Sequence, residues 1–270
     1  MKSSALVSLF VKPFLWLRKI RGLKLVYTPL LAIVLFTMVM SVILGTLHLH
    51  EKNQQESALF RELSFAKQRI QLRFANNTET LNSINREIAA STEDAKLRQL
   101  VRDQADDLIM NNHEIVKIIW LDAESKPIWS VPVKNNKSDF ISRTQDDKTA
   151  NENLANTIEL SKATSRAAFS AFITLSSPTE EPIAKERRTV FWQVVPNIIG
   201  GQTVGFLAAL YTAQGVLEII PGELKAYYRF TLMTDNERVL AISSDRNTPK
   251  RAFSNQTSLD IGVLSPNMVL

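Results

Sequence analysis

Two arginines and three large aromatic residues are the side chains of this sequence best suited to hold a small molecule. They are Trp129, Arg166, Arg188, Trp192 and Tyr211, and they fall in or beside segments expected to be strands. An arginine guanidinium can bind a carboxylate through two parallel hydrogen bonds, while tryptophan and tyrosine provide apolar walls. We therefore predict that these five residues line a ligand pocket between a sheet and its covering loops. The alternative is that the aromatic residues belong to the core and the arginines to the surface.

Motifs for catalysis or metal binding are absent from the sequence. It contains no phosphate-binding glycine loop, no HExxH zinc motif and no GxSxG nucleophile motif. It also contains no cysteine, which excludes disulfides, thiolate metal sites and a thiol nucleophile. His113 is expected to end a helix, and Asp103, Asp106 and Asp107 are expected to form a solvated helix face. We therefore expect no catalytic residue, no metal ion and no cofactor in these residues.

The positive net charge of the chain comes from its N-terminal arm. Residues 1–24 carry six lysines or arginines and no acidic residue, whereas the whole chain has a net charge of +5. The rest of the chain therefore sums to −1, and it has no basic patch or stripe. This charge distribution argues against a nucleic-acid partner.

An apolar run from Leu25 to Leu49 follows the basic arm, and residues 30–47 contain no charged side chain. A helix of about 17–25 apolar residues spans a bilayer, so we predict a transmembrane helix. The excess of lysine and arginine before the run places the N-terminus in the cytoplasm and residues 50–270 outside it. A cleaved signal peptide is an alternative, but its apolar region would be shorter and would precede a small-residue cleavage site. A buried helix of a soluble protein is a second alternative.

A helical stalk is predicted after the apolar run, at residues 50–112. Mostly apolar residues recur there at steps of three and four, which is the spacing of a coiled-coil seam. The seam residues are Phe60, Leu63, Lys67, Ile70, Phe74, Asn77, Leu81, Ile84 and Ile88. The seam is expected to pair with a second protomer, to pack on its own domain, or to do both in part. A joint at residues 89–90 separates this helix from a second one, which is expected to end near Asn111.

Beyond the helices, the apolar pattern changes to the alternation that is typical of strands. Strands are expected at residues 114–123, 128–133, 166–175, 189–199 and 204–212, and a helix at residues 150–162. Gly200-Gly201 between two apolar runs favours a tight hairpin. This order predicts an α+β fold in which a five-stranded antiparallel sheet has helices on one side.

Two hairpin segments carry a resemblance to a known family. They are IIWLDAESKPIWSVP at residues 118–132 and VFWQVVPNIIGGQTVGFLAALYT at residues 190–212. After a span and a long helix, this arrangement resembles the extracytoplasmic PAS-like sensor domain called Cache or PDC. After a short helix expected at residues 213–225, FTLMTDNERVLAIS at residues 230–243 repeats the first hairpin pattern, which is similar to a double Cache arrangement. The expected divisions are a cytoplasmic arm at 1–24, a transmembrane helix at 25–49, a stalk at 50–112, a membrane-distal sensor domain at 113–212 and an incomplete membrane-proximal module at 213–270.

The resemblance implies a function in signal transduction across a bacterial inner membrane. We expect the sensory input region of a two-component sensor histidine kinase, cut before its output domain, that binds an unknown small molecule and forms a homodimer through the stalk. Any kinase activity would lie in the output domain, so the enzymatic status of this chain stays open. Alternatives are the input region of a chemoreceptor or of a cyclic-dinucleotide enzyme, or a single-anchor periplasmic interaction protein.

Overall fold

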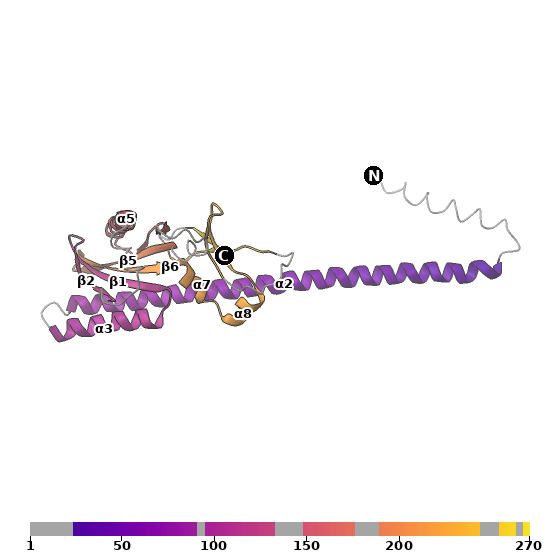
Figure 1. Ribbon diagram of the computed structural model, residues 1–270, viewed down its shortest axis with the longest axis horizontal. Coiled ribbons are helices and arrows are strands. Elements are labelled where there is room, and N and C mark those ends of the chain that lie inside the picture. The colour runs from indigo at the N-terminus through magenta and orange to yellow at the C-terminus, as the bar shows by residue number, and fades with distance from the viewer. Residues whose placement is uncertain (1–23, 91–94, 133–147, 176–188, 244–253, 263–266) are drawn as a thin grey trace. The chain divides into compact units, whose positions relative to one another are not determined.

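The computed structural model describes residues 24–90, 95–132, 148–175, 189–243, 254–262 and 267–270 (Figure 1). The chain divides into two compact units, residues 1–58 and residues 59–270. Helix α2, Lys24–Ala90, contributes residues to both units. Each unit is described below by itself.

In the first unit, residues 31–49 of α2 are mostly apolar and are exposed on every side. This helix is long and apolar enough to cross a membrane, with a mean hydropathy of 2.2 over its most apolar window and none of that window buried. The few polar side chains in this segment bond within the helix, because the Thr37 hydroxyl donates to the Ile33 carbonyl at 2.6 Å and the Ser41 hydroxyl to the Thr37 carbonyl at 2.8 Å. Such internal bonding satisfies polar groups that would otherwise face hydrocarbon. These features fit the predicted span.

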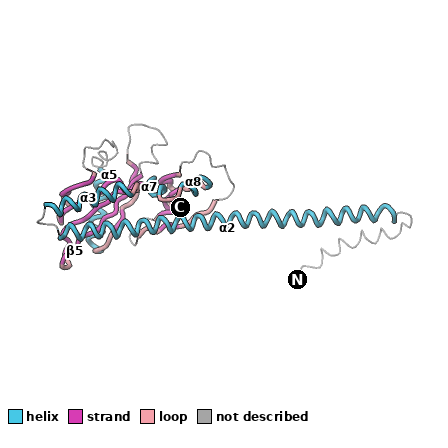
Figure 2. The backbone as a smooth tube through the Cα atoms, turned by 90° about the horizontal axis from the view of Figure 1, so that it is seen from below, coloured by secondary structure: helices cyan, strands magenta, loops and turns pink. Residues whose placement is uncertain are grey.

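In the second unit, the seam of α2 is buried within its own chain. Leu63, Ile70, Phe74, Leu81 and Ile84 are each at most 6% exposed. They pack in one core with helix α3, Ala95–Asn111, which runs back alongside the C-terminal part of α2 (Figure 1 and Figure 2). A second protomer and the chain's own domain were the two partners expected for the seam. Between residues 63 and 84, the seam packs on its own domain.

The larger sheet has six strands, all paired antiparallel, in the order β2-β1-β6-β5-β3, with β4 also paired to β5. The strands are β1 (Ile115–Asp122), β2 (Pro127–Val131), β3 (Ala168–Phe169), β4 (Ile173–Thr174), β5 (Thr189–Ile199) and β6 (Gln202–Thr212). The β5–β6 hairpin is closed by Gly200 and Gly201, which both have positive φ angles, of 57° and 81°. A two-residue hairpin turn of this kind requires that conformation, so the predicted hairpin is confirmed.

The strand predicted at residues 166–175 is wrong in one respect, since it is two short strands. Ser170 separates them: its hydroxyl accepts a hydrogen bond from the Trp192 amide at 2.8 Å and donates one to the Ala171 carbonyl at 2.8 Å. A side chain that bonds to the backbone in this way replaces part of the ladder between strands. The sheet therefore has six strands where the sequence pattern indicated five.

Helices cover both faces of this sheet, not one as predicted. Helices α2 and α3 pack on one face, and helix α5, Lys148–Thr164, packs on the other (Figure 1). The central strands explain this, because consecutive residues of β5 from Val190 to Val195 are all buried. A strand that is apolar on both sides needs cover on both sides.

A second, four-stranded sheet has the order β8-β7-β10-β9. Its strands are β7 (Thr231–Thr234), β8 (Val239–Ile242), β9 (Ser258–Leu259) and β10 (Met268–Val269). The single helix expected at residues 213–225 is two short helices, α7 (Ala213–Glu218) and α8 (Gly222–Tyr227), because Pro221 interrupts the helical hydrogen bonds. Buried residues of this sheet join the same core as α2 and the larger sheet.

Candidate functional site

The predicted pocket residues Trp192 and Tyr211 lie on neighbouring strands but on opposite faces of the larger sheet. Trp192 is buried under α5 and donates from Nε1 to the Ala150 carbonyl at 3.3 Å. Tyr211 is fully buried on the face that packs against α2. The sheet itself therefore separates these two aromatic residues.

The other three predicted residues are also spread over the domain. Trp129 is half-buried on the edge strand β2, and the Arg102 guanidinium of α3 lies 6.0 Å from its ring centre. Arg166 is exposed just after α5, and its carbonyl accepts from the Ser161 hydroxyl at 2.8 Å. Arg188 lies outside the described residues. Ligand binding by these five residues stays a prediction.

A chain of hydrogen bonds runs from Tyr211 to α2. The Tyr211 hydroxyl donates to Oε1 of Gln193 at 2.7 Å, and Nε2 of Gln193 donates to the Thr78 hydroxyl at 2.7 Å. The Thr78 hydroxyl donates in turn to the Phe74 carbonyl of α2 at 2.7 Å. Strands β6 and β5 are thus joined to the helix by directional bonds as well as by apolar packing.

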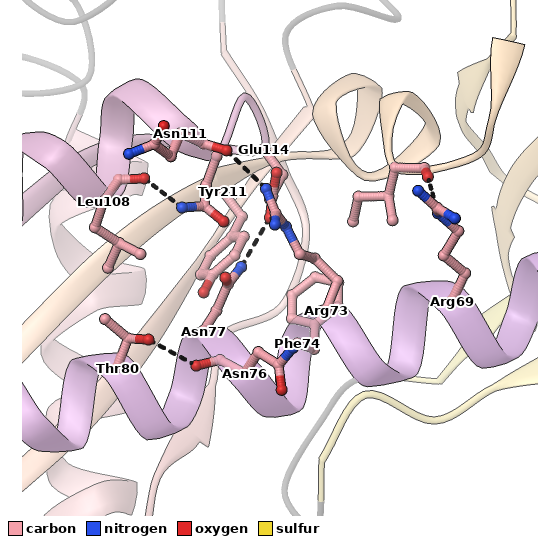
Figure 3. Close-up of polar contacts among 12 residues, drawn as sticks. Arg69, Arg73, Phe74, Asn76, Asn77, Thr80, Leu108, Asn111, Glu114 and Tyr211 are labelled. Carbon is pink, nitrogen blue, oxygen red and sulfur yellow. Dashed lines mark hydrogen bonds and ion pairs between the residues drawn. The ribbon is translucent and has the colours of Figure 1, made fainter.

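A buried carboxylate provides a second connection between the sheet and α2. Glu114, just before β1, has only 3% of its side chain exposed, and it accepts from Nε of Arg73 at 2.7 Å and from Nδ2 of Asn77 at 2.8 Å (Figure 3). Nη2 of Arg73 also donates to the Asn111 carbonyl at the end of α3, at 2.8 Å. Arg73 therefore joins α2 to the end of α3 and to the start of β1. A buried charge needs such partners to be tolerated.

The negative charge of Glu114 also acts on Tyr211. Burial raises the pKa of the Tyr211 hydroxyl well above its usual value, and the nearby Glu114 carboxylate raises that pKa further. The phenol therefore stays protonated and remains a hydrogen-bond donor to Gln193.

Sequence patterns gave one signal for this polar cluster. Asn77 is a polar residue at a core position of the seam, and it is only 2% exposed. A buried polar residue at such a position can fix the register of a helix against its partner. Glu114 and Arg73 gave no comparable signal, because nothing local in the sequence shows that a glutamate at a strand start will be buried beside an arginine 41 residues earlier.

Further polar contacts join α2 to both sheets along its length. Asn85 donates to the Pro196 carbonyl at 2.9 Å, and Asn197 donates to the Asn85 carbonyl at 2.9 Å. Towards the second sheet, Nε2 of Gln71 donates to the Asp260 carbonyl at 2.8 Å. The axial position of α2 is therefore specified at several points between residues 69 and 85.

A cleft of about 460 Å³ lies beside the Glu114 cluster, between α2, the start of β1 and α7. Its lining residues are Arg69, Leu72, Arg73, Asn76, His113, Glu114, Glu218 and Ile219. Helix α7 approaches closely here because Gly215 has no side chain, and a Cβ atom on Gly215 would come within 2.4 Å of Cα of Glu114. Among the described residues, no group of His, Cys, Asp or Glu side chains is arranged to hold a metal ion.

Comparisons with known proteins address the fold. No protein-family model matches the chain, and no curated protein sequence does. The structure is similar to that of an extracellular ligand-binding receptor from Desulfohalobium retbaense, with a TM-score of 0.53 and 12% identity. That similarity covers 79% of this chain and 39% of the receptor.

Two ligand-binding domains of chemoreceptors are also similar. One is that of CtaA from Pseudomonas fluorescens in complex with L-serine, with a TM-score of 0.49, 13% identity, and coverage of 81% of this chain and 96% of that domain. The other is that of PctB from Pseudomonas aeruginosa in complex with L-Arg, with a TM-score of 0.47 and 12% identity. The similarity covers 80% of this chain and 93% of that domain.

The chain has a Cache-like fold. At identities this low the likeness concerns the fold alone. The predicted α+β architecture, a long N-terminal helix followed by antiparallel sheets, is confirmed. In this fold, α2 packs in one core with residues of both sheets, and we take the polar contacts around Arg73 and Glu114 that hold it there as the candidate functional site.

Proposed function

We propose that this chain is the membrane-anchored sensory input region of a signal-transducing receptor, and specifically of a two-component sensor histidine kinase. One observation carries the proposal: the apolar segment and the buried seam belong to the same uninterrupted helix, α2. A helix that contacts a sensor domain and also enters a membrane can transmit a displacement between them. A chemoreceptor or a cyclic-dinucleotide enzyme would use the same input and differ in its output domain.

The proposed topology is a single span in a bacterial inner membrane. The six cations of residues 1–24 support a cytoplasmic N-terminus, because lysine and arginine are retained on that side. Residues 50–270 would then be periplasmic. In this scheme the larger sheet belongs to a membrane-distal module at residues 113–212 and the smaller sheet to a membrane-proximal one at residues 213–270.

The proposed mechanism is a shift of α2 against the sheets. A ligand bound at the larger sheet would favour one packing of that sheet on α2. Because α2 is held through Arg73, Asn77, Thr78 and Asn85 at the same time, sliding it would break several hydrogen bonds together. Such coupled contacts favour two discrete positions over a continuous range. Ligand binding would select between them.

The proposed homodimer would use a face of α2 other than the seam. Between residues 63 and 84 the seam is occupied by the chain's own core. Exposed apolar residues off the seam on the same part of the helix are Phe65 and Leu72, at 48% and 63%. These side chains are available to a second copy of α2.

Cysteine labelling tests the proposed topology. The chain has no cysteine of its own, so an introduced cysteine is the only thiol that can be labelled. The full chain is expressed in bacteria with a single Ser3→Cys or Glu79→Cys substitution and treated with a membrane-impermeant maleimide. We expect labelling of the Glu79→Cys variant in cells with a permeable outer membrane, and labelling of the Ser3→Cys variant only after lysis. The reverse pattern, or equal labelling of both variants before lysis, would contradict the proposed topology.

Oxidative cross-linking in membranes from the same bacteria tests the dimer. Phe65→Cys and Leu72→Cys place the thiol on the exposed face of α2, and Ile70→Cys is the matched control on the buried face. We expect disulfide-linked dimers from at least one of the exposed positions and none from the control. Absence of cross-linking at both exposed positions would count against a dimer through α2.

A further inference from the structure

Charge is unevenly compensated in the cleft beside Glu114. Arg69 and Arg73 lie one turn apart on α2, and their side chains leave the helix on the same side (Figure 3). Two carboxylates also line the cleft, and both have a cationic partner. Glu114 is paired with Arg73 at 2.7 Å, and Glu218 is paired with Lys225 at 2.7 Å.

Arg69 is the cation that these pairs leave uncompensated. Its Nε donates to the Ile219 carbonyl at 3.1 Å, which aims the guanidinium across the cleft towards α7 (Figure 3). Within the described part of the chain, no carboxylate pairs with it and its two terminal nitrogens have no acceptor. His113 lines the same cleft and can supply a further N–H donor.

The size and the walls of the cleft suit a small molecule. Its volume of about 460 Å³ falls within the range of roughly 300–1,000 Å³ that is common for small-molecule sites. Leu72 and Ile219 provide apolar surface beside the cations. None of the five residues predicted to bind ligand from the sequence lies in its lining.

We propose that this cleft is a second ligand site, which binds a small organic anion that carries a carboxylate or a phosphate group. The Arg69 guanidinium would bind the anionic group through its free edge, since its planar donors match two oxygens of either group. His113 would donate to the same group, and the carbon skeleton would lie against Leu72 and Ile219. The bound anion would hold α7 to α2 and so stiffen the connection that leads from the larger sheet to the smaller one.

Calorimetry on the full chain in detergent micelles tests this site. Succinate, inorganic phosphate and glycerol 3-phosphate are titrated at constant ionic strength, with chloride as the competing ion. We expect saturable binding of one anion per chain for at least one probe, and the preferred probe identifies the carboxylate or the phosphate class. The Arg69→Gln variant should bind about 10- to 100-fold more weakly, because it loses a charge-assisted hydrogen bond.

Arg61→Gln is the matched control, because Arg61 is an exposed arginine of the same helix outside the cleft. It should leave the affinity unchanged. The proposal is overturned if no probe saturates the wild-type chain, or if Arg61→Gln weakens binding as much as Arg69→Gln does.

A labelling experiment locates the bound anion without altering Arg69. It therefore tests whether the anion binds in the cleft even if Arg69→Gln does not fold. Asn76→Cys places a thiol at the cleft, and Glu79→Cys places one on an exposed part of α2 outside it. The anion that binds in calorimetry should slow maleimide labelling of the first variant and leave the second unchanged. Equal effects on both variants, or no effect on either, would refute the site.

Discussion

Two stretches of one helix, residues 31–58 and residues 59–88 of α2, are both rich in apolar residues but meet different surroundings. In the first, large apolar side chains such as Leu35 and Phe36 are 62% and 66% exposed. In the second, most apolar residues form one buried stripe, in which residues such as Ile70 and Phe74 are completely buried. A helix that is apolar all round is suited to lipid, whereas a striped helix is suited to a protein core. The arrangement of apolar residues around the helix, together with the high hydropathy of the first stretch, therefore separates the two environments.

Polar side chains in the two stretches differ in the same way. In the first stretch, Thr37 and Ser41 bond to carbonyls of their own helix. In the second, Asn77 and Asn85 bond to groups of the larger sheet or of the segment that precedes it. The second stretch therefore has a fixed axial position against its partners, whereas the bonds of Thr37 and Ser41 lie within the helix and specify no such position. The predictions below test this contrast, from the largest effect to the smallest.

Truncating a buried seam residue should have the largest effect. Phe74 is fully buried, with its ring centre 5.1 Å from that of Tyr211 and 6.1 Å from that of Phe169. Phe74→Ala should lower the free energy of unfolding by about 3–5 kcal/mol, because it removes these contacts and leaves a cavity. Urea unfolding of the full chain in detergent micelles measures the loss.

Phe60→Ala is the matched control, since Phe60 is on the same helix and is 58% exposed. Its cost should lie within about 0.5 kcal/mol. Similar losses for the two variants would mean that burial does not determine the cost of losing a phenylalanine from α2.

A charge in the first stretch should affect the membrane and not the fold of the second unit. Leu35→Arg places a cation in the middle of the apolar segment, which opposes insertion by about 2.5–3.5 kcal/mol. We expect a larger fraction of the chain to be extracted from membranes by alkaline carbonate. The urea midpoint of the second unit should not change. A full retention in the membrane would contradict a span centred on this segment.

High pH should weaken the contact between the second stretch and the sheet. Because burial raises the pKa of Tyr211, the unfolded chain loses this proton first, near pH 10. The folded state is then the one that holds more protons, so stability should fall as the pH rises above about 10, by up to about 1.4 kcal/mol per pH unit. Tyr211→Phe should remove this part of the alkaline loss. An identical alkaline slope in both proteins would exclude Tyr211 as its source.

A polar contact that does not involve α2 should matter least. The hydrogen bond from Lys225 lowers the pKa of Glu218, so this pair adds stability above about pH 4.5, and that stability is lost as the pH falls through the lower folded value. Half of the Glu218 side chain is exposed, so Lys225→Gln should cost at most about 1 kcal/mol at neutral pH. The difference from wild type should disappear in acid. A cost near that of Phe74→Ala would show that α7 and α8 carry more of the stability than their exposure suggests.

Most elements of the fold follow from local sequence patterns. The two long strands of the β5–β6 hairpin have 11 residues each, are rich in apolar residues, and flank Gly200-Gly201. Their ends were therefore predicted to within two residues. The helices end where predicted, α2 at Ala90 and α3 at Asn111. Local errors occurred where a side chain or a proline interrupts a pattern, at Ser170 and at Pro221.

The candidate site was predicted much less completely. Asn77 was marked as a polar residue on the seam, but its partner was not identified. The cleft around Arg69 was not predicted at all, because its walls come from α2, the start of β1 and α7, which are separated by up to 150 residues along the chain.

By itself, the sequence determined the apolar segment, the charge before it, the helical seam and the order of the strands, because each depends on residues that are close together in the chain. Tertiary structure decided which partner the seam meets, which face of the sheet each aromatic residue occupies, and that Glu114 is buried between Arg73 and Asn77. Those outcomes depend on how separate elements share one core. Trp192 and Tyr211 illustrate the reason. The Gly200-Gly201 turn alone would place both side chains on one face, but a register shift between Asn197 and Ile198 pairs Trp192 with Leu210 and Phe191 with Tyr211, and so places them on opposite faces.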